Sequence, residues 1–337
     1  MSAAIPRVAV VGAGAWGTTL ADLLTRKGAT VTIWAREPEV VAGINRDHMN
    51  DIFLPDAPLA PGLCATGDVA EAVRGAEVVV CATPSHAVRA VMSEAAAAAG
   101  NHPLVVSVSK GLEPERQERL SCVLQDVFGL GAPVAVLSGP SFAREVYDRQ
   151  PTAVVAAAAD HAVAQHVQRV FATATFRVYS HTDVVGVELG GALKNVIAVA
   201  TGIAEGLGLG HNPRAALITR GLAELTRLGQ ALGADPLTFA GLAGLGDLVL
   251  TATGALSRNR SLGVELGQGR RLEDILSSRK TVAEGVTTAR TAVLLGGRHG
   301  VELPIASEVS AIVFEGKSPR QAIADLMERA PKPEQWR

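Results

Sequence analysis

The sequence predicts an α/β fold in which a doubly wound, mostly parallel sheet is followed by an all-α C-terminal domain. Three observations predict it. Short apolar runs alternate with helical segments up to Ser180, a glycine-rich turn follows the first run, and strand-like runs largely disappear after Ser180. Continuous apolar strands separated by helices are typical of a parallel sheet that is covered on both faces.

The first half of the chain contains seven expected strands. They are residues 7–11, 30–34, 77–82, 104–108, 134–137, 153–157 and 176–179. A helical run ending near Lys27 follows the glycine turn, and the alanine run at 95–99 belongs to a crossover helix because alanine is the best helix former. Each of these strands is short, apolar and bounded by turn or helical segments, as a buried strand should be.

The second half consists of long helical stretches punctuated by glycine, at residues 184–204, 214–232 and 237–242, with further ones up to 328. We assign residues 1–181 to the sheet domain, 182–330 to the helical domain and 331–337 to a polar tail. Two domains fit the length of 337 residues. No flexible linker separates the two, so we expect them to pack closely with a cleft between them.

The composition excludes several classes of protein. Lys and Arg number 31 and Asp and Glu 33, which gives a net charge of −2 and no electrostatic footprint for nucleic acid. Aromatic residues make up only 4% of the chain, which argues against base-stacking surfaces. The apolar segment 184–204 carries Glu188, Lys194 and Asn195, so we do not expect it to insert into a membrane.

Three cysteines are too few and too widely spaced for a disulfide framework or a zinc site. They are Cys64, Cys81 and Cys122. An odd, sparse set fits a reducing compartment, so we expect a cytoplasmic protein. The histidines show no HxxxH or HExxH spacing, and we expect no metal.

The turn after the first strand reads Gly12-Ala13-Gly14-Ala15-Trp16-Gly17. In a dinucleotide-binding Rossmann-type domain, the first glycine permits a tight turn, the second lets the cofactor pyrophosphate approach the backbone, and the third lets helix and strand pack closely. The following helix N-terminus offers N–H groups to the phosphates. Gly12, Gly14 and Gly17 are therefore expected to bind a dinucleotide.

The end of the second strand reads Trp34-Ala35-Arg36-Glu37. Arg36 could pair with a 2′-phosphate, which favours NADP as the cofactor, because no acid stands directly at the strand end to hold the ribose diol. An ordinary surface arginine is the alternative, and Glu37 leaves NAD open.

Three charged residues stand in surroundings that do not suit charge. Lys194 lies in an apolar helix that should be buried, where a lysine is rare unless it is paired or functional, and burial lowers its pKa toward a useful range for proton transfer. Asp247, isolated in a glycine-rich apolar stretch, is a candidate partner, with a helix cap as the alternative. Lys110 follows the end of an expected parallel strand, where open α/β sheets bind ligands.

A polar cluster at Ser257-Arg258-Asn259-Arg260-Ser261 precedes an expected helix. Hydroxyl, guanidinium and amide groups at a helix start make an anion site, and arginine can bind phosphate through two hydrogen bonds. The alternative is a capped helix with a basic first turn, which is an unfavourable place for cations. The cluster therefore predicts a phosphate-binding site.

Over nearly its whole length the chain resembles the soluble, bacterial type of NAD(P)-dependent glycerol-3-phosphate dehydrogenase. The segments that carry the resemblance are VGAGAWGTTLA (11–21), SVSKGLE (107–113), LSGPSFAREV (137–146), ELGGALKNVIAVATGIAEGLGLG (188–210), GLAGLGDLVLTATG (241–254), SRNRSLG (257–263) and VAEGVTT (282–288). The resemblance implies reversible reduction of dihydroxyacetone phosphate to sn-glycerol 3-phosphate, a precursor of glycerophospholipids.

The same resemblance implies a role for each matching residue. Lys194 would act as acid and base, Lys110 would polarise the substrate, and Asp247 would orient Lys194 or a water. The implied substrate contacts are Lys110, Gly139, Ser141, Lys194, Asp247, Ser257, Arg258 and Asn259. The implied cofactor contacts, besides the three glycines, are Trp16, Arg36, Lys110, Ala143, Arg258, Val282 and Glu284. The family is often dimeric, so we expect a homodimer.

Two other functions compete with this one. A β-hydroxyacid dehydrogenase or ketopantoate-reductase type enzyme also joins a Rossmann domain to a helical domain that contains a lysine. The polar cluster that starts at Ser257 and the pairing of Lys194 with Asp247 favour a phosphorylated substrate instead. A non-catalytic dinucleotide sensor would be expected to lack the set of Lys110, Lys194 and Asp247, which this chain retains.

Overall fold

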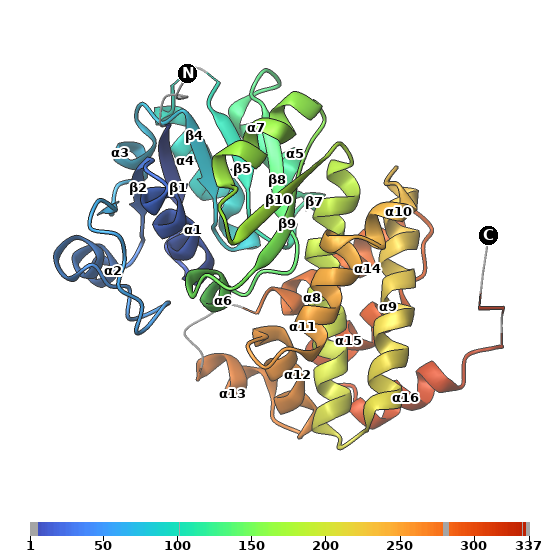
Figure 1. Ribbon diagram of the computed structural model, residues 1–337. Coiled ribbons are helices and arrows are strands. Elements are labelled where there is room, and N and C mark those ends of the chain that lie inside the picture. Colours follow the sequence, from blue (N-terminus) through green and yellow to red (C-terminus); the bar gives the residue numbers. More distant parts are fainter. Residues whose placement is uncertain (1–5, 101, 279–282, 332, 335–337) are drawn as a thin grey trace.

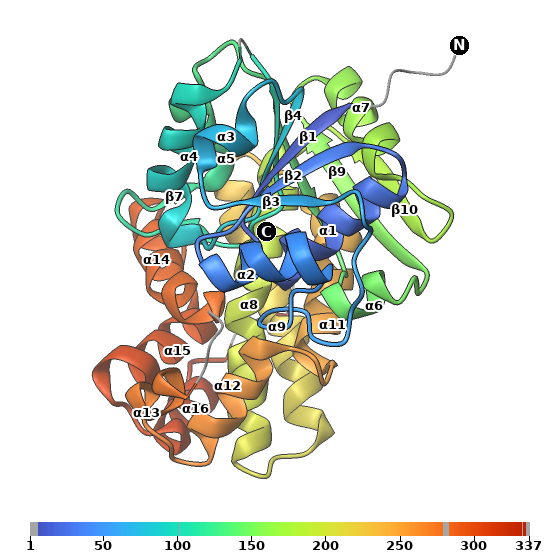
Figure 2. The ribbon, with the colours of Figure 1, turned by 90° about the vertical axis from the view of Figure 1, so that its left-hand side faces the viewer.

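The computed structural model describes residues 6–100, 102–278, 283–331 and 333–334. The chain forms a sheet domain, coloured blue to green in Figure 1, and a helical domain, coloured yellow to red. Figure 2 shows the second domain below the sheet. The α/β fold class and its order along the chain are as the sequence predicts.

The sheet has eight strands in the order β10-β9-β8-β5-β4-β1-β2-β3. Their bounds are β1 Arg7–Val11, β2 Thr30–Trp34, β3 Cys64–Thr66, β4 Val78–Cys81, β5 Leu104–Ser107, β8 Val134–Ser138, β9 Thr152–Ala158 and β10 Phe176–His181. All neighbours pair in parallel except β8 and β9. The sequence-based prediction missed the edge strand β3 and the two-residue hairpin strands β6 (Leu112–Glu113) and β7 (Glu118–Arg119), which are too short to show a pattern.

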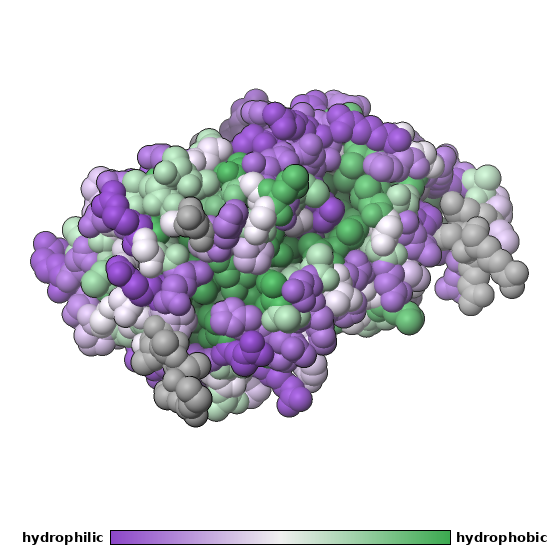
Figure 3. Space-filling view, turned by 90° about the horizontal axis from the view of Figure 1, so that it is seen from above, coloured by the Kyte–Doolittle hydropathy of each residue, from purple (hydrophilic) through white to green (hydrophobic). Residues whose placement is uncertain are grey.

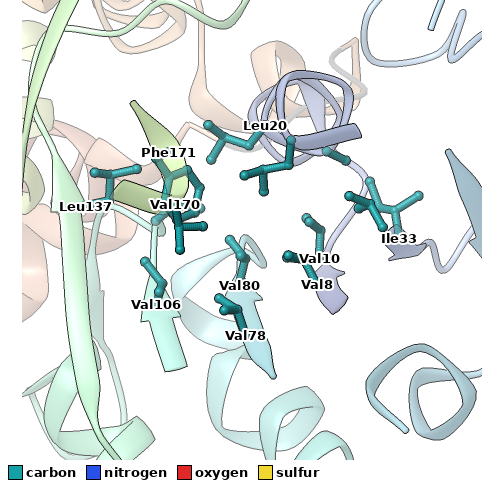
Figure 4. Close-up of a cluster of buried hydrophobic side chains, with 14 of the residues drawn as sticks. Val8, Val10, Leu20, Ile33, Val78, Val80, Val106, Leu137, Val170 and Phe171 are labelled. Atoms are coloured by element: carbon teal, nitrogen blue, oxygen red, sulfur yellow. The ribbon is translucent and has the colours of Figure 1, made fainter. Parts of the chain in front are cut away.

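Both faces of the sheet are covered because successive side chains of a strand point to opposite faces. Val8 and Val10 of β1 pack on one face with Leu20 of α1 (Ala15–Arg26) and Phe171 of α7 (His161–Phe171), as Figure 4 shows. The alternate residues of β1 pack on the other face. There they meet α3 (Val69–Val73), α4 (Val88–Ala98) and α5 (Leu120–Phe128).

Short elements occupy the connections of the sheet domain. They are α2 (Pro38–Ala42), the π-helix η1 (Gly43–Asp47), the 3-10 helix η2 (Ser85–Ala87) and α6 (Ala143–Tyr147). Lys27, just beyond α1, donates hydrogen bonds to the carbonyls of Arg169, Val170 and Ala172 at 2.5, 2.9 and 2.6 Å. The ammonium thus satisfies carbonyl groups at the C-terminus of α7, where a cation is favourable.

The helical domain is built around α8 (Val184–Gly206), which is buried along almost its whole length. The surrounding elements are α9 (His211–Ala231), α10 (Pro236–Phe239), η3 (Leu242–Gly246), α11 (Asp247–Thr253), α12 (Arg258–Gly267), α13 (Leu272–Ser277), α14 (Glu284–Arg298), α15 (Pro304–Glu315) and α16 (Pro319–Met327). A Cβ atom at Gly202 would lie 2.1 Å from the carbonyl oxygen of Arg260 in α12. Glycine at this position therefore lets α8 and α12 approach closely.

Among the described residues, two segments have the length and apolarity of a membrane span, 184–206 and 236–253. The first is α8, and 89% of its most apolar window is buried inside the helical domain. The second is divided into α10, η3 and α11. The apolarity of α8 is explained by its place at the centre of a helical core.

The two domains are joined by direct polar contacts. The last strand ends at His181 and α8 begins at Val184, with Asp183 as its N-cap. Glu188 of α8, itself buried, accepts hydrogen bonds from the backbone N–H and hydroxyl of Ser121 in α5, at 2.8 and 2.6 Å. The carboxylate thus anchors α8 to the N-terminus of a sheet-domain helix.

Candidate active site

A buried carboxylate joins two lysines where the domains meet. Asp247, at the start of α11, is 1% exposed and accepts hydrogen bonds from Lys194 Nζ on Oδ1 at 2.6 Å and from Lys110 Nζ on Oδ2 at 2.8 Å. Lys194 lies on α8 and is 6% exposed. Lys110 follows β5 and is half-buried. The structure therefore brings together three residues that the sequence singled out on three separate segments.

The environment lowers the pKa of two of these groups, which favours the neutral amine of Lys194 but the ionised carboxylate of Asp247. Burial lowers the pKa of Lys194 to about 8, against the opposing attraction of Asp247. Burial by itself would raise the pKa of Asp247, but the charges of Lys110 and Lys194 outweigh it and hold that pKa below its usual value. Lys194 can therefore gain and lose a proton near neutral pH while Asp247 stays ionised.

A strained backbone turn brings a carbonyl to Lys110. Gly139, directly after β8, has a φ of 137°, and a Cβ atom there would lie 2.9 Å from Cα of Val154. Its carbonyl accepts a hydrogen bond from Lys110 Nζ at 2.8 Å, and Ser141 Oγ lies 3.3 Å from the same ammonium. Gly139 and Ser141 thus line the exposed side of Lys110, as expected for groups that contact the same ligand.

A chain of amides connects the cluster to the start of α12. Asn195 Nδ2 donates to the carbonyl of Lys110 at 3.2 Å, and its Oδ1 accepts from Nδ2 of Asn259 at 2.9 Å. Asn259 Oδ1 in turn accepts from the backbone N–H of Gly285 at 2.9 Å. Asn259 is buried, and these bonds make it a positioning residue that holds α8, α12 and α14 together.

The residues of the expected phosphate-binding cluster differ in their contacts, because some of them bind other parts of the helical domain. Ser257 is the N-cap of α12, where its hydroxyl accepts from the N–H of Arg260 at 3.2 Å, as the capped-helix alternative predicts. Arg260 donates to both carboxylate oxygens of Glu205, at 2.7 and 2.6 Å. Arg258, the first residue of α12, is exposed as a whole residue, but burial of its guanidinium lowers the pKa of that group against the attraction of Glu284. Arg258 is the more exposed of the two arginines, which makes it the candidate cation for an incoming anion.

The glycine motif adopts the conformation that its sequence predicts. Gly12 has a φ of 120°, and a Cβ atom there would lie 2.7 Å from the carbonyl oxygen of Ala82. Gly14 is the N-cap of α1, and a Cβ atom there would have no neighbour within 4 Å. A Cβ atom at Gly17 would lie 1.9 Å from the carbonyl oxygen of Gly12. The first and third glycines are required by packing, and the second leaves open space before a helix N-terminus.

Further observations test whether this end of the sheet fits a dinucleotide. Trp16 Nε1 is buried, and no hydrogen-bond partner is present for it among the described residues. The indole packs against Phe176 with a ring-centroid distance of 6.3 Å. Ala143 lies beside α1, because its carbonyl accepts from Thr19 Oγ1 at 3.2 Å. An open glycine turn and an orphaned indole donor are features that a bound nucleotide would complete.

One of the expected cofactor residues, Glu284, is the first residue of α14. Glu284 accepts hydrogen bonds from the N–H and the hydroxyl of Ser85, at 3.1 and 2.5 Å. Ser85 follows β4 in η2, so the carboxylate links the helical domain to the end of the sheet beside the glycine turn. Val282 lies outside the described residues.

Two residues of the site escaped the sequence-based prediction. Thr251 accepts a hydrogen bond from Lys194 Nζ at 2.7 Å and donates to Asp247 Oδ1 at 3.2 Å. Asn195, next to Lys194, holds the backbone of Lys110. A polar residue four positions after Asp247 on an apolar helix is the signal that could have identified Thr251, since such residues share a helix face.

Two other features of the described chain offer no second site. No group of three or more His, Cys, Asp or Glu side chains gathers there as a metal site would require. A cavity of about 320 Å³ lies between α14, α15 and α16, away from the lysine cluster. Its carboxylates Glu308 and Asp325 are both paired with Lys317 at 2.5 Å, so we assign it no chemistry.

Comparison with known proteins identifies a consistent set of relatives. The family model described as the N-terminus of NAD-dependent glycerol-3-phosphate dehydrogenase matches residues 7–164, and the one described as its C-terminus matches residues 183–324. The chain is 53% identical over 330 residues to glycerol-3-phosphate dehydrogenase (NAD(P)+) of Geobacter metallireducens, covering 97% of this chain and 98% of the relative.

Solved structures agree with the sequence matches. The crystal structure of glycerol-3-phosphate dehydrogenase from Coxiella burnetii superposes with a TM-score of 0.93 at 37% identity, covering 96% of this chain and 99% of that one. A ketopantoate reductase from Ralstonia eutropha superposes with a TM-score of 0.62 at 18% identity, covering 94% and 99%. The second likeness shows a shared fold alone.

Proposed function

The chain belongs to the family of NAD-dependent glycerol-3-phosphate dehydrogenases, and on that premise we propose which of its residues carry the reaction. The protein is an NAD(P)-dependent oxidoreductase that reversibly reduces dihydroxyacetone phosphate to sn-glycerol 3-phosphate. The observation that carries the proposal is the buried carboxylate of Asp247 between Lys194 and Lys110. The carboxylate holds a proton donor, Lys194, and a second cation, Lys110, at one point of the domain junction.

Lys194 is the proton donor in the direction of reduction. When bound, NAD(P)H supplies the hydride to the carbonyl carbon. The Nζ–H bond of Lys194 breaks as the proton moves to the carbonyl oxygen, which becomes the hydroxyl of the product. In the reverse direction the neutral amine accepts that proton. A pKa of about 8 suits both directions near neutral pH.

Lys110 stabilises the negative charge that develops on the same oxygen. A fixed cation aimed at a developing oxyanion is among the strongest catalytic devices available to a protein. Gly139, Ser141 and Asp247 fix the ammonium before substrate arrives. Asp247 is thus a positioning residue and the shared counterion for both lysines.

Arg258 binds the phosphate of the substrate. It stands exposed at the start of α12, where backbone N–H groups also favour an anion. Ser257 can donate its hydroxyl proton to phosphate while its oxygen remains the helix cap. Holding the remote phosphate places the small ketone beside Lys194, so binding energy is used to orient the reacting carbonyl.

The dinucleotide binds along the carboxyl edge of the sheet. Gly12, Gly14 and Gly17 would hold its pyrophosphate, with Trp16 and Ala143 beside the same helix. Arg36 would lie at the ribose end and Glu284 at the domain junction. The resemblance also assigns Val282 to this set.

A substrate comparison tests the proposal. Oxidation of NADPH or NADH, followed by absorbance, should be fast with dihydroxyacetone phosphate and slow with unphosphorylated dihydroxyacetone or ketopantoate. Turnover with all three ketones would contradict a dedicated phosphate site. Turnover of ketopantoate alone would move the protein to the reductase class with which it shares a fold. Dinucleotide binding without turnover of any ketone would indicate a sensor.

We further propose a cytoplasmic homodimer that supplies glycerol 3-phosphate for phospholipid synthesis. Three unpaired cysteines support a reducing compartment. Figure 3 shows apolar residues gathered along the middle of one face with hydrophilic residues around them, as a protein interface often has. Light scattering coupled to size-exclusion chromatography tests the dimer, since a monomeric mass at micromolar concentration would refute it. Cell fractionation tests the location.

A further inference from the structure

Two side chains of opposite charge stand just beyond the end of β2. The backbone N–H of Gly12 donates to the carbonyl of Trp34 at 3.2 Å, so the glycine turn lies directly beside this strand end. In dinucleotide-binding folds an acid about 20 residues beyond the glycine motif binds the ribose 2′-hydroxyl of NAD, whereas an arginine nearby accommodates the 2′-phosphate of NADP. This chain carries both, as Arg36 and Glu37.

The two side chains bind each other. Arg36 Nε and Nη2 both donate to Oε1 of Glu37, at 3.2 and 2.9 Å. The Arg36 side chain is 83% exposed and that of Glu37 only 29% exposed, so the carboxylate is the better fixed of the two. Both of these bonds end on Oε1, and a carboxylate has further acceptor capacity on its second oxygen. Glu37 can therefore hold Arg36 and accept another hydrogen bond at the same time.

We propose that Glu37 sets the balance between the two dinucleotides by binding the arginine that would otherwise select the 2′-phosphate. The inference rests on the proposed function and deepens it. A ribose 2′-hydroxyl can donate to Glu37 with the ion pair intact. A 2′-phosphate must either share Arg36 with Glu37 or draw it away, and in both cases it lies near a carboxylate of the same sign. Breaking an exposed ion pair costs little free energy, so the protein still binds NADPH. The affinity for NADPH relative to NADH is nevertheless reduced.

Nucleotide fragments test this without turnover. Adenosine 2′,5′-bisphosphate and adenosine 5′-monophosphate carry the two ribose ends, and calorimetry measures their dissociation constants for the full-length protein. Glu37→Gln keeps the size of the side chain and removes its charge. We expect the variant to shift the ratio of the two constants about tenfold toward the bisphosphate, which corresponds to about 1.4 kcal/mol. Arg36→Gln should shift the ratio in the opposite direction.

A matched control is available in the same domain. Arg46 and Asp47 form a similar pair of exposed neighbours in η1, with Nη2 of Arg46 2.8 Å from Oδ2 of Asp47. Asp47→Asn removes one carboxylate from the domain without touching the end of β2, so it should leave the ratio unchanged. Circular dichroism checks that each variant is folded.

The outcomes separate the inference from the proposed function. An unchanged ratio in Glu37→Gln, or an equal shift in Asp47→Asn, overturns the role of Glu37 even if dihydroxyacetone phosphate is reduced. Failure of the unsubstituted protein to bind either fragment overturns both the inference and the proposed dinucleotide site. A tenfold shift in Glu37→Gln alone, matched by a rise in the ratio of kcat/KM for NADPH to that for NADH, supports the inference.

Discussion

Replacing Asp247 by Asn removes the one carboxylate that contacts both lysines while keeping the shape of the side chain. In the structure Asp247 Oδ1 lies 2.6 Å from Lys194 Nζ. At that separation, opposite unit charges attract by about 6 kcal/mol at an effective dielectric constant of about 20, before the cost of desolvation is subtracted. The remaining influences on Lys194, which are burial and the charges of Lys110 and Arg258, all lower its pKa.

We therefore expect the pKa of Lys194 to fall from about 8 by at least about one unit in Asp247→Asn, which is 1.36 kcal/mol per unit. Reduction requires the protonated amine, so kcat/KM should decline above the new pKa instead of above pH 8. At pH 8 the smaller protonated fraction alone lowers kcat/KM by about fivefold or more, and this part of the loss should disappear near pH 6. Loss of contact with Lys110 adds a decrease that does not vary with pH.

The assay is the pH profile of kcat/KM for dihydroxyacetone phosphate at saturating NADPH, because this ratio reports groups of the substrate-free enzyme. Asp148→Asn is the control, since Asp148 forms an exposed pair with Arg144 at 3.0 Å. Titration of NADPH fluorescence shows whether each variant still binds cofactor. An inflection at the same pH in Asp247→Asn and in the unsubstituted enzyme would refute the assignment of Lys194 as the proton donor held by Asp247.

Three further predictions concern other parts of the molecule. Arg258→Ala should raise KM for dihydroxyacetone phosphate by roughly 10- to 100-fold, because a charge-assisted bond to phosphate is lost, and steady-state kinetics with an unchanged KM would exclude Arg258 from the phosphate site. Glu224 caps the N-terminus of α15, and burial raises its pKa to about 7. Its protonated form therefore stabilises the folded state, fully below pH 4.5. This contribution of up to about 3 kcal/mol is lost as pH rises through 7. Glu224→Gln should flatten that decline in urea-unfolding midpoints between pH 5 and 8, and an unaltered slope would contradict it. Lys27→Met should lower the free energy of unfolding by about 1 kcal/mol through loss of the bonds to the end of α7, and a thermal midpoint equal to that of the parent would show that these bonds contribute nothing.

Much of the sheet domain follows from local sequence. The apolar runs at β1 and β2 are predicted with their observed bounds. Each of the other predicted strands begins or ends within two residues of its observed bounds. The strand β3 was missed because three residues at a sheet edge are too few to establish a pattern. The antiparallel pairing of β8 with β9 was equally inaccessible, since strand direction depends on the path of the chain between strands and not on their composition.

In the candidate site, too, local sequence predicts some residues and misses others. Gly12, Gly14 and Gly17 act through the backbone of one turn, so their spacing alone predicts what they do. Lys194 was identifiable because a lysine in an apolar helix conflicts with its surroundings. Thr251 gave only a weak signal, its spacing of four residues from Asp247, because a threonine is ordinary on such a helix and its contact with Lys194 depends on another element.

The sequence by itself determined the α/β class, the glycine turn and the identity of the lysines, because these depend on hydrophobic period, on the conformational freedom of glycine and on the cost of burying charge. Only the tertiary structure decided that Asp247 would bridge Lys194 and Lys110. A hydrogen bond forms over about 3 Å, so it depends on the packed positions of whole elements. Distances of that kind between segments far apart in the chain are set only when both domains are assembled.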